Sequence, residues 1–448
     1  MSTPSIIEAI RNDAQVISPD GRLDFLIDDI GNASIVLLGE ATHGTHEFYL
    51  LRAEISKRLI TEKRFDAIAV EADWPDALRT SRFIQASARS SDATVDEALH
   101  GFERFPQWMW RNTDVVELLS WLRMHNLQRP DQRDKVGFYG LDLYSLRNSM
   151  DAVVRYLSQV DPEAARRARA RYACFDHLAE DPQRYGYAAS FGMRKDCEDE
   201  VIRQLVEMTN DGNRFVAIAG DAEADELFYA QQNARVAQNA EAYYRAMFQG
   251  RNQSWNLRDR HMAETLEALR SHLIAQKGRR PKIIVWAHNS HLGDARATEM
   301  GEHGQLNLGQ LVREQYGSKE SFLLGFTTHA GTVTAASDWD APAERKTVRP
   351  SHPDSYERLF HDCGLGRFVV PLRRNSRLYG LLEEQRLERA IGVVYLPETE
   401  RVSHYFHASL ARQFDAVIHV DETRAVLPLE RNVAHQAGDL PETYPSGI

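Results

Sequence analysis

The chain has 448 residues, of which 43% are hydrophobic and 27% are charged, values typical of a globular protein with one large domain or two to three smaller ones. Its formal net charge of -11 disfavours nucleic acid as a partner, because phosphate groups carry the same sign. No segment approaches the roughly 20 consecutive apolar residues of a membrane span, so no membrane partner is expected. Residues 1–8 lack the basic and then apolar pattern of a secretory signal.

The cysteines are few and scattered. Cys174, Cys197 and Cys363 show no Cys-x-x-Cys spacing, which argues against a disulfide scaffold and against a structural zinc site. A reducing environment is therefore expected, and with it a cytoplasmic location. The sequence gives no indication of the oligomeric state.

Short apolar runs rich in β-branched residues are typical of strands buried on both faces of a parallel sheet. Such runs lie at 34–40, 65–71, 135–142 and 282–288, with later candidates at 322–326, 368–372, 391–395 and 414–420. Residues 47–62, between the first two runs, have the apolar spacing of a helix. This alternation predicts a three-layer α/β/α fold with a mainly parallel sheet.

A long segment from about 145 to 280 is charged and poor in strand-like runs. Helical spacing occurs at 164–173, 194–210, 222–248 and 257–274, whereas 214–220 fits either a short strand or a buried helix. We expect a large helical insertion at 145–280 within one composite domain, whose α/β core consists of 1–144 and 281–448. The insertion could serve as a lid or as a structural cover. Residues 435–448 are expected to be loosely ordered.

Four predicted strands end in an ionisable residue: Glu40, Glu71, Asp142 and His288. Ligands of open parallel sheets bind beyond the carboxyl ends of the strands, so these side chains are expected to converge. Glu71 precedes Trp74 and Pro75, which could form an apolar wall that disfavours its ionised form; alternatively, Glu71 holds an imidazolium. Asp142 could instead serve only as a helix N-cap.

The densest cluster is the segment Gly39-Glu40-Ala41-Thr42-His43-Gly44. Gly44 would permit a positive φ in the turn, and Thr42 or Thr45 could cap the helix that follows. Backbone N–H groups at the start of that helix could stabilise an anion or oxyanion. The alternative is that Glu40 and His43 merely pair and cap the helix.

Further polar residues are candidates for substrate contacts. His46 begins the helix, where a structural role is equally consistent, and Arg52 lies two turns along it, either on a solvated face or within reach of a carboxylate in the site. Arg258 opens another helix and could form a surface ion pair or bind polar groups of a substrate. His288 and His291, three residues apart, suit a metal pair or an acid/base group with a helper.

Several familiar motifs are absent from the sequence. It contains no Gly-x-Ser-x-Gly nucleophile turn, no phosphate-binding Gly-x-x-x-x-Gly-Lys-Ser/Thr loop, no Gly-x-Gly-x-x-Gly fingerprint and no His-Glu-x-x-His. Histidines and carboxylates without such a nucleophile favour activation of water by a general base.

Five motifs together resemble the erythromycin esterase family: residues 39–44, 71–75, 140–142, 258–263 and 286–291. The resemblance runs in order from about residue 30 to residue 425, and 398–406 resemble a broad bacterial branch of unknown substrate. It implies an α/β/α core with a helical addition, and hydrolysis of a macrolide lactone, the chemistry of macrolide antibiotic resistance, by an activated water. It further implies that His43 is the base and that Glu40, Glu71, Arg52 and His288 support it.

The main hypothesis is a hydrolase of a small-molecule carboxylic ester or lactone, with His43 as general base and no cofactor expected. Its catalytic residues would be His43, Glu40, Glu71 and His288, and its substrate-binding residues Arg52, His46, Asp142, Arg258 and His291. The second hypothesis is a hydrolase in which the same cluster holds a divalent metal ion. The third is a small-molecule-binding protein without catalytic activity.

Overall fold

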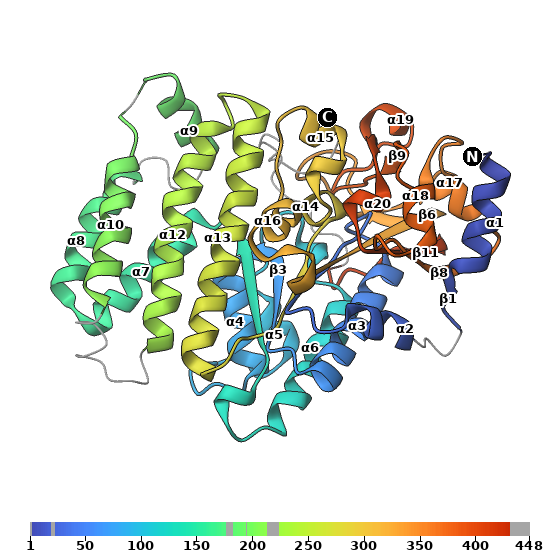
Figure 1. Ribbon diagram of the computed structural model, residues 1–448. Helices are drawn as coiled ribbons and strands as arrows, with labels where there is room; N and C mark the ends of the chain where they lie inside the picture. The colour runs from blue at the N-terminus through green and yellow to red at the C-terminus, as the bar shows by residue number, and fades with distance from the viewer. Residues whose placement is uncertain (1, 19–22, 176–181, 194, 213–223, 431–448) are drawn as a thin grey trace. The chain divides into compact units, whose positions relative to one another are not determined.

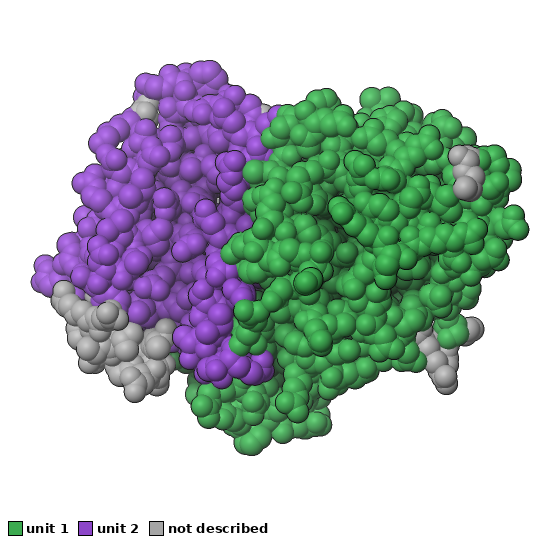
Figure 2. Space-filling model, viewed as in Figure 1, with its two compact units in different colours: residues 1–70, 80–138, 280–448 green, residues 71–79, 139–279 purple. Residues whose placement is uncertain are grey.

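The computed structural model describes residues 2–18, 23–175, 182–193, 195–212 and 224–430 (Figure 1). The chain divides into two compact units, drawn in different colours in Figure 2. Unit 1 comprises residues 1–70, 80–138 and 280–448, and unit 2 comprises residues 71–79 and 139–279. Each unit is described by itself.

The sheet has nine strands in the described part of the chain, in the order β1-β8-β11-β6-β2-β5-β3-β4, with β7 paired to β6. Their bounds are β1 Gln15–Val16, β2 Ile35–Leu38, β3 Ala67–Asp73, β4 Gly137–Asp142, β5 Ile283–Trp286, β6 Ser321–Ala335, β7 Glu344–Val348, β8 Arg367–Pro371 and β11 Ala416–Thr423. The pairs β11–β6, β6–β2, β2–β5 and β5–β3 are parallel, whereas β1, β7 and β8 pair antiparallel. Strands β9 (Arg386–Arg389) and β10 (Tyr405–Ala408) form a separate antiparallel pair.

The register of the central strands sets the position of the site. Leu38, the last residue of β2, lies beside Trp286, the last residue of β5. Because parallel strands run in the same direction, the segments that follow β2 and β5 leave the sheet at the same edge. Glu40 and His288, each two residues beyond its strand, therefore start from neighbouring points.

The helices of unit 1 include α1 (Thr3–Asp13), α2 (Asp24–Ile30), α3 (His46–Lys63), α5 (Val95–Leu99), α6 (Thr113–Leu127), α14 (Asn289–Leu292), α15 (Glu299–Glu302), α16 (Leu308–Glu320), α17 (Tyr356–His361), α18 (Arg377–Leu381), α19 (Glu400–Ser403) and α20 (Leu410–Gln413). Helix α3 follows its sequence pattern closely. Its buried face carries Phe48, Leu51, Ile55 and Leu59, at helical spacing. The helix ends at Lys63, because the next residue, Arg64, has a left-handed φ of 58° that cannot continue it.

Unit 2 consists mainly of helices. They are α7 (Leu146–Val160), α8 (Pro162–Tyr172), α9 (Pro182–Ser190), α10 (Glu198–Asn210), α12 (Ala224–Ala246) and α13 (Arg251–Lys277), while α4 (Trp74–Ile84) begins in unit 2 and ends in unit 1. Helix α12 packs against α7, α9, α10 and α13, and one cluster of buried side chains fills the space around it. Of the helices described, none is long and apolar enough to cross a membrane.

The α/β fold with mainly parallel strands is confirmed, but two details differ from prediction. Residues 391–395 do not form a strand, because Ile391 and Val394 make only isolated bridges, to Thr42 and Ala336. Strand β6 extends well beyond 322–326 to Ala335, and its second half carries β7. Residues 214–220, expected as a short strand or a buried helix, and residues 435–448, expected to be loosely ordered, lie outside the described residues.

Two of the three cysteines are paired, which the spacing of the cysteines did not predict. Cys174 and Cys197 form a disulfide across a sequence separation of 23, with their Cα atoms 5.9 Å apart. Cys363 is free and buried. The pairing depends on how the chain folds between α8 and α10, which the spacing of the cysteines does not reveal. The cysteine pattern therefore no longer supports a reducing compartment.

Reducing this disulfide should lower the free energy of unfolding by about 3 kcal/mol, because the opened loop regains conformational entropy in the unfolded chain. Urea unfolding of the wild type with and without dithiothreitol measures the difference. The Cys174→Ala/Cys197→Ala variant is the matched control and should not respond to reductant. An equal response in both proteins would contradict this role for the bond.

Candidate active site

The turn after β2 is fixed by backbone hydrogen bonds. The carbonyl of Glu40 accepts the N–H of Asn289 at 2.8 Å, and the carbonyl of Gly44 accepts those of Thr334 and Val426, both at 3.0 Å. A Cβ on Gly44 would lie 1.9 Å from the Thr334 carbonyl oxygen. Gly44 has no positive φ, contrary to prediction. Glycine is required here because another backbone segment comes too close for any side chain.

The start of α3 also differs from expectation. Thr45 is the N-cap residue, but its hydroxyl pairs with that of Thr42 instead of capping the helix. The first helical N–H, that of His46, donates to the carbonyl of Arg424 at 2.8 Å. This N–H is therefore not available as an oxyanion donor.

Beneath the turn, one buried carboxylate binds two partners. Glu40 Oε1 lies 3.0 Å from His43 Nδ1, and Glu40 Oε2 accepts from Arg52 Nη2. All three side chains are at most 2% exposed. Because a carboxylate only accepts hydrogen bonds, the proton of a neutral His43 sits on Nδ1, and Nε2 is its basic nitrogen.

Arg52 is held by more than its ion pair. Its guanidinium carbon lies 4.6 Å from the ring centroid of Tyr49 and 4.5 Å from that of Trp286. The face of an aromatic ring attracts a cation, most strongly where water is excluded. Burial, followed by the charge of Glu40, raises the pKa of Tyr49 well above its usual value, so this ring stays neutral. The structure thus brings together Arg52 and Glu40, which are 12 residues apart.

His288 and His43 lie next to each other with opposite hydrogen-bonding polarity. Their ring centroids are 4.9 Å apart, and both side chains are fully buried. His288 Nδ1 accepts the backbone N–H of Ser290 at 3.2 Å, which places the proton of a neutral His288 on Nε2. His288 is then a donor at the nitrogen where His43 is an acceptor. His291, also buried, follows in α14.

His46 belongs to a different pair. Its Nδ1 lies 2.7 Å from Asp114 Oδ1, and this hydrogen bond raises the pKa of the imidazole. The side chain is 27% exposed, and it lines a cavity of about 340 Å³ together with Thr334, Arg424 and Val426. Its predicted role as a substrate ligand beside His43 has no contact to support it.

In unit 2, Arg258 binds the two other predicted carboxylates. Its Nη2 donates to Glu71 Oε1 at 2.8 Å and to Asp142 Oδ2 at 2.6 Å, and its Nε donates to Asp142 Oδ1 at 3.1 Å. The guanidinium also lies 5.0 Å from the centroid of the Tyr144 ring. Glu71 and Asp142 lie on the parts of β3 and β4 that belong to unit 2, and Arg258 lies on α13, so this cluster connects the helix to the ends of these two strands.

Asn289 was missed by reasoning from sequence. Its Nδ2 donates to the Phe326 carbonyl at 2.7 Å, and its Oδ1 accepts the Phe326 N–H at 3.2 Å. Its Oδ1 would lie 2.2 Å from a Cβ on Gly39. This side chain therefore couples β6 to the segment that carries His288. Gly39 and Asn289 are far apart in the sequence, so their contact can be recognised only when the order of the strands is known.

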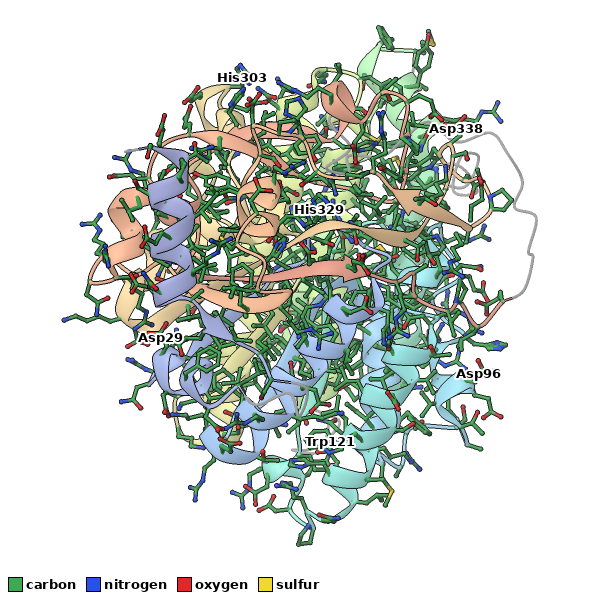
Figure 3. All side chains as sticks on the ribbon, turned by 90° about the vertical axis from the view of Figure 1, so that its right-hand side faces the viewer. Asp29, Asp96, Trp121, His303, His329 and Asp338 are labelled. Carbon is green, nitrogen blue, oxygen red and sulfur yellow. A yellow bond between two sulfur atoms is a disulfide. The ribbon has the colours of Figure 1, made fainter. Side chains whose placement is uncertain are left out.

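Elsewhere in unit 1, further histidines gather around Asp421. His361 Nδ1 and His419 Nε2 lie 2.8 and 3.3 Å from Asp421 Oδ1, and the ring of His329, labelled in Figure 3, stacks on that of His361. Within the described ranges, no group of three or more His, Cys, Asp or Glu side chains is arranged to hold a metal ion. His43 and His291, which were proposed as ligands of a divalent ion, therefore belong to no such group in the described part of the chain.

Comparison with known proteins identifies the family. The model of a family described as erythromycin esterase matches residues 60–423. The chain belongs to the erythromycin esterase family. The match begins beyond His43 but contains Glu71, Asp142, Arg258 and His288.

Two curated relatives are named as a hydrolase and as an esterase. The YbfO protein of Bacillus subtilis (strain 168), assigned provisionally to the hydrolases, is 24% identical over 342 residues, covering 73% of this chain and 71% of its own. Erythromycin esterase type II of Escherichia coli is 21% identical over 422 residues, covering 88% and 90%. Together with the family, these names support hydrolase activity on a small-molecule substrate.

Several solved structures share the fold of this chain. A Bacillus cereus protein superposes with a TM-score of 0.76 at 21% identity, covering 96% of this chain and all of its own. A succinoglycan biosynthesis protein gives 0.76 at 20% identity, covering 95% and 98%. An erythromycin esterase mutant in its open conformation gives 0.65 at 17% identity, covering 92% and 97%.

Replacing Asp114 with asparagine should lower the pKa of His46, because the charged acceptor of its hydrogen bond is lost. The raised pKa implies a stabilising contribution that is present at low pH and lost as pH rises through it. The variant should therefore lose more unfolding free energy at about pH 6 than at about pH 9. NMR titration of His46 checks the shift, with the exposed His100 as internal control. An unchanged His46 titration would refute the pairing.

Replacing Arg258 with methionine should destabilise the protein by about 3–5 kcal/mol, since two buried carboxylates would lose their cation. Arg260→Met, at an exposed position on the same helix, is the matched control and should change stability little. Urea unfolding measures both variants. Equal effects would show that the Arg258 cluster contributes nothing specific.

Proposed function

We propose that this protein hydrolyses carboxylic esters or lactones, using a water molecule activated by His43. The observation that carries the proposal is the buried Glu40–His43 pair, with Glu40 anchored by Arg52. A histidine whose Nδ1 proton is bound by a carboxylate presents Nε2 as a base, and the carboxylate stabilises the imidazolium that forms.

The proposed reaction has two proton transfers. His43 Nε2 takes a proton from water while the water oxygen bonds to the carbonyl carbon, and the carbonyl becomes an oxyanion. When the tetrahedral intermediate collapses, the alkoxide leaves and accepts the proton of the His43 imidazolium, while the Nε2–H of His288 donates a hydrogen bond to the developing negative charge. The 4.9 Å between the two rings supports this division between base and donor. The steps require no metal ion.

Glu71 was predicted to assist His43 directly. Its 2.8 Å hydrogen bond to Arg258 supports another assignment, in which Glu71 and Asp142 hold Arg258 in place. We assign no proton transfer to Glu71, and none to His46 or His291. If Arg258 binds substrate, as the sequence predicted, it does so while paired with Glu71 and Asp142.

The substrate is proposed at the level of a bond type. The relative named erythromycin esterase type II makes macrolide lactones one class to include, and simple aryl esters and small lactones are others. A chelator added to the assay separates this mechanism from the metal-dependent alternative, because activity should persist without divalent ions.

Replacing His43 with asparagine should reduce hydrolysis about 10²- to 10⁴-fold, the usual contribution of a positioned general base. Product release from a panel of aryl esters, small lactones and macrolides, followed by absorbance or mass spectrometry, measures the rate. His46→Asn is the matched control in the same turn and should keep most of the activity.

Two outcomes would count against the proposal. One is hydrolysis by His43→Asn at the wild-type rate, with circular dichroism showing that both variants are folded. The other is tight binding of an intact panel compound by the wild type with no product, which would favour a binding protein.

A further inference from the structure

Unit 2 contains a cavity of about 480 Å³ that is lined by residues of α12, of α13 and of the turn that joins them. The two helices are labelled in Figure 1. This volume lies within the roughly 300–1,000 Å³ of small-molecule sites. Amides are the most numerous side chains in its lining: Asn239, Gln249, Asn252, Gln253 and Asn256. The exposed amides of Gln249 and Gln253 each carry donors and an acceptor, so the wall can match groups that donate and accept at once.

The rest of the lining narrows the class of ligand. Ala242, Ala246 and Leu257 supply an apolar patch of modest size. Among the described residues that line the cavity, the only ring is the imidazole of His261. A flat aromatic ligand would therefore find no Phe, Tyr or Trp to stack on.

The charges around the cavity do not favour an anion. Arg245 is already paired with two carboxylates, Glu241 at 2.8 Å and Glu198 at 3.2 Å. The other lining cation, Arg260, is offset by Glu264 in the same lining. No excess of positive charge remains, so an uncharged ligand fits better than a phosphate or carboxylate.

One part of the wall is fixed before any ligand binds. Burial lowers the pKa of His261 to about 4, so the imidazole is neutral near pH 7. Asn239 Nδ2 lies 2.9 Å from His261 Nδ1, and only the amide nitrogen can be the donor if that ring nitrogen accepts. Asn239 then presents its Oδ1 as an acceptor, and its orientation costs a ligand no further entropy.

We propose that this cavity binds an uncharged, polyhydroxylated ligand, namely a saccharide unit. Sugar hydroxyls donate and accept as the amides do, and the C–H face of a sugar ring would pack on the alanines and Leu257. The proposal rests on residues of unit 2 alone, and it stands whether or not the chain hydrolyses esters.

Saturation-transfer NMR on the full-length protein tests the proposal with D-glucose, D-galactose, D-mannose, N-acetyl-D-glucosamine, maltose and lactose. D-glucuronate and inorganic phosphate serve as anionic probes, and adenosine as the flat-ring probe. At least one neutral sugar should bind better than every anionic or flat-ring probe. Binding of no sugar, or a preference for an anionic probe, overturns the proposal.

Two variants locate the binding. Ala242→Phe places a ring in the cavity and should abolish the signal, whereas Ala152→Phe, at a similarly half-buried position on α7, should not. Gln253 is exposed, so Gln253→Leu should fold normally and lose affinity by about 2- to 10-fold through one missing hydrogen bond. Sugar binding that survives both cavity variants overturns the assignment to this site.

Discussion

The carboxylate of Glu40 is the constraint on which the candidate site depends. A buried charge is costly unless it is paired and hydrogen-bonded, and both Glu40 oxygens have a partner, Arg52 on one and His43 on the other. Arg52 in turn lies against the rings of Tyr49 and Trp286. Loss of either Arg52 or His43 would leave one oxygen of the buried Glu40 carboxylate without this partner. The orientation and tautomer of His43 are therefore set by the same contacts that make Glu40 tolerable in the interior.

Backbone packing leaves this arrangement little freedom. Gly44 contacts the Thr334 backbone and Gly39 contacts the Asn289 side chain, both at distances that exclude a Cβ. These contacts place the turn between β6 and the segment that carries His288. A glycine chosen for close approach differs physically from one chosen for a positive φ: it depends on the neighbouring strand as well as on its own dihedral angles. The conformation of the turn therefore depends on the position of β6, against which Gly44 packs.

Much of this was predictable from sequence, and the exceptions have one cause. Glu40 and His288 follow apolar runs whose order and direction imply a common sheet edge, and the register of β2 and β5 bears this out. Local pattern cannot show contacts between segments far apart in sequence, such as that of Arg258 with Glu71. The same limit hid the Cys174–Cys197 pair. It also made residues 391–395 resemble a strand, because an apolar run does not reveal whether a neighbouring strand is available to pair.

The two arginine clusters differ in the number of carboxylates that the arginine binds. Arg52 meets a single carboxylate, so the unit 1 cluster is neutral while His43 is neutral, and proton transfer to His43 gives it one positive charge. In the proposed reaction, an oxyanion formed in the same step would balance this charge, which would favour concerted proton transfer and attack on the carbonyl. Arg258 binds two carboxylates, those of Glu71 and Asp142, and the backbone N–H of Leu143 also donates to Asp142 at 2.9 Å. These bonds connect α13 to the ends of β3 and β4 that belong to unit 2.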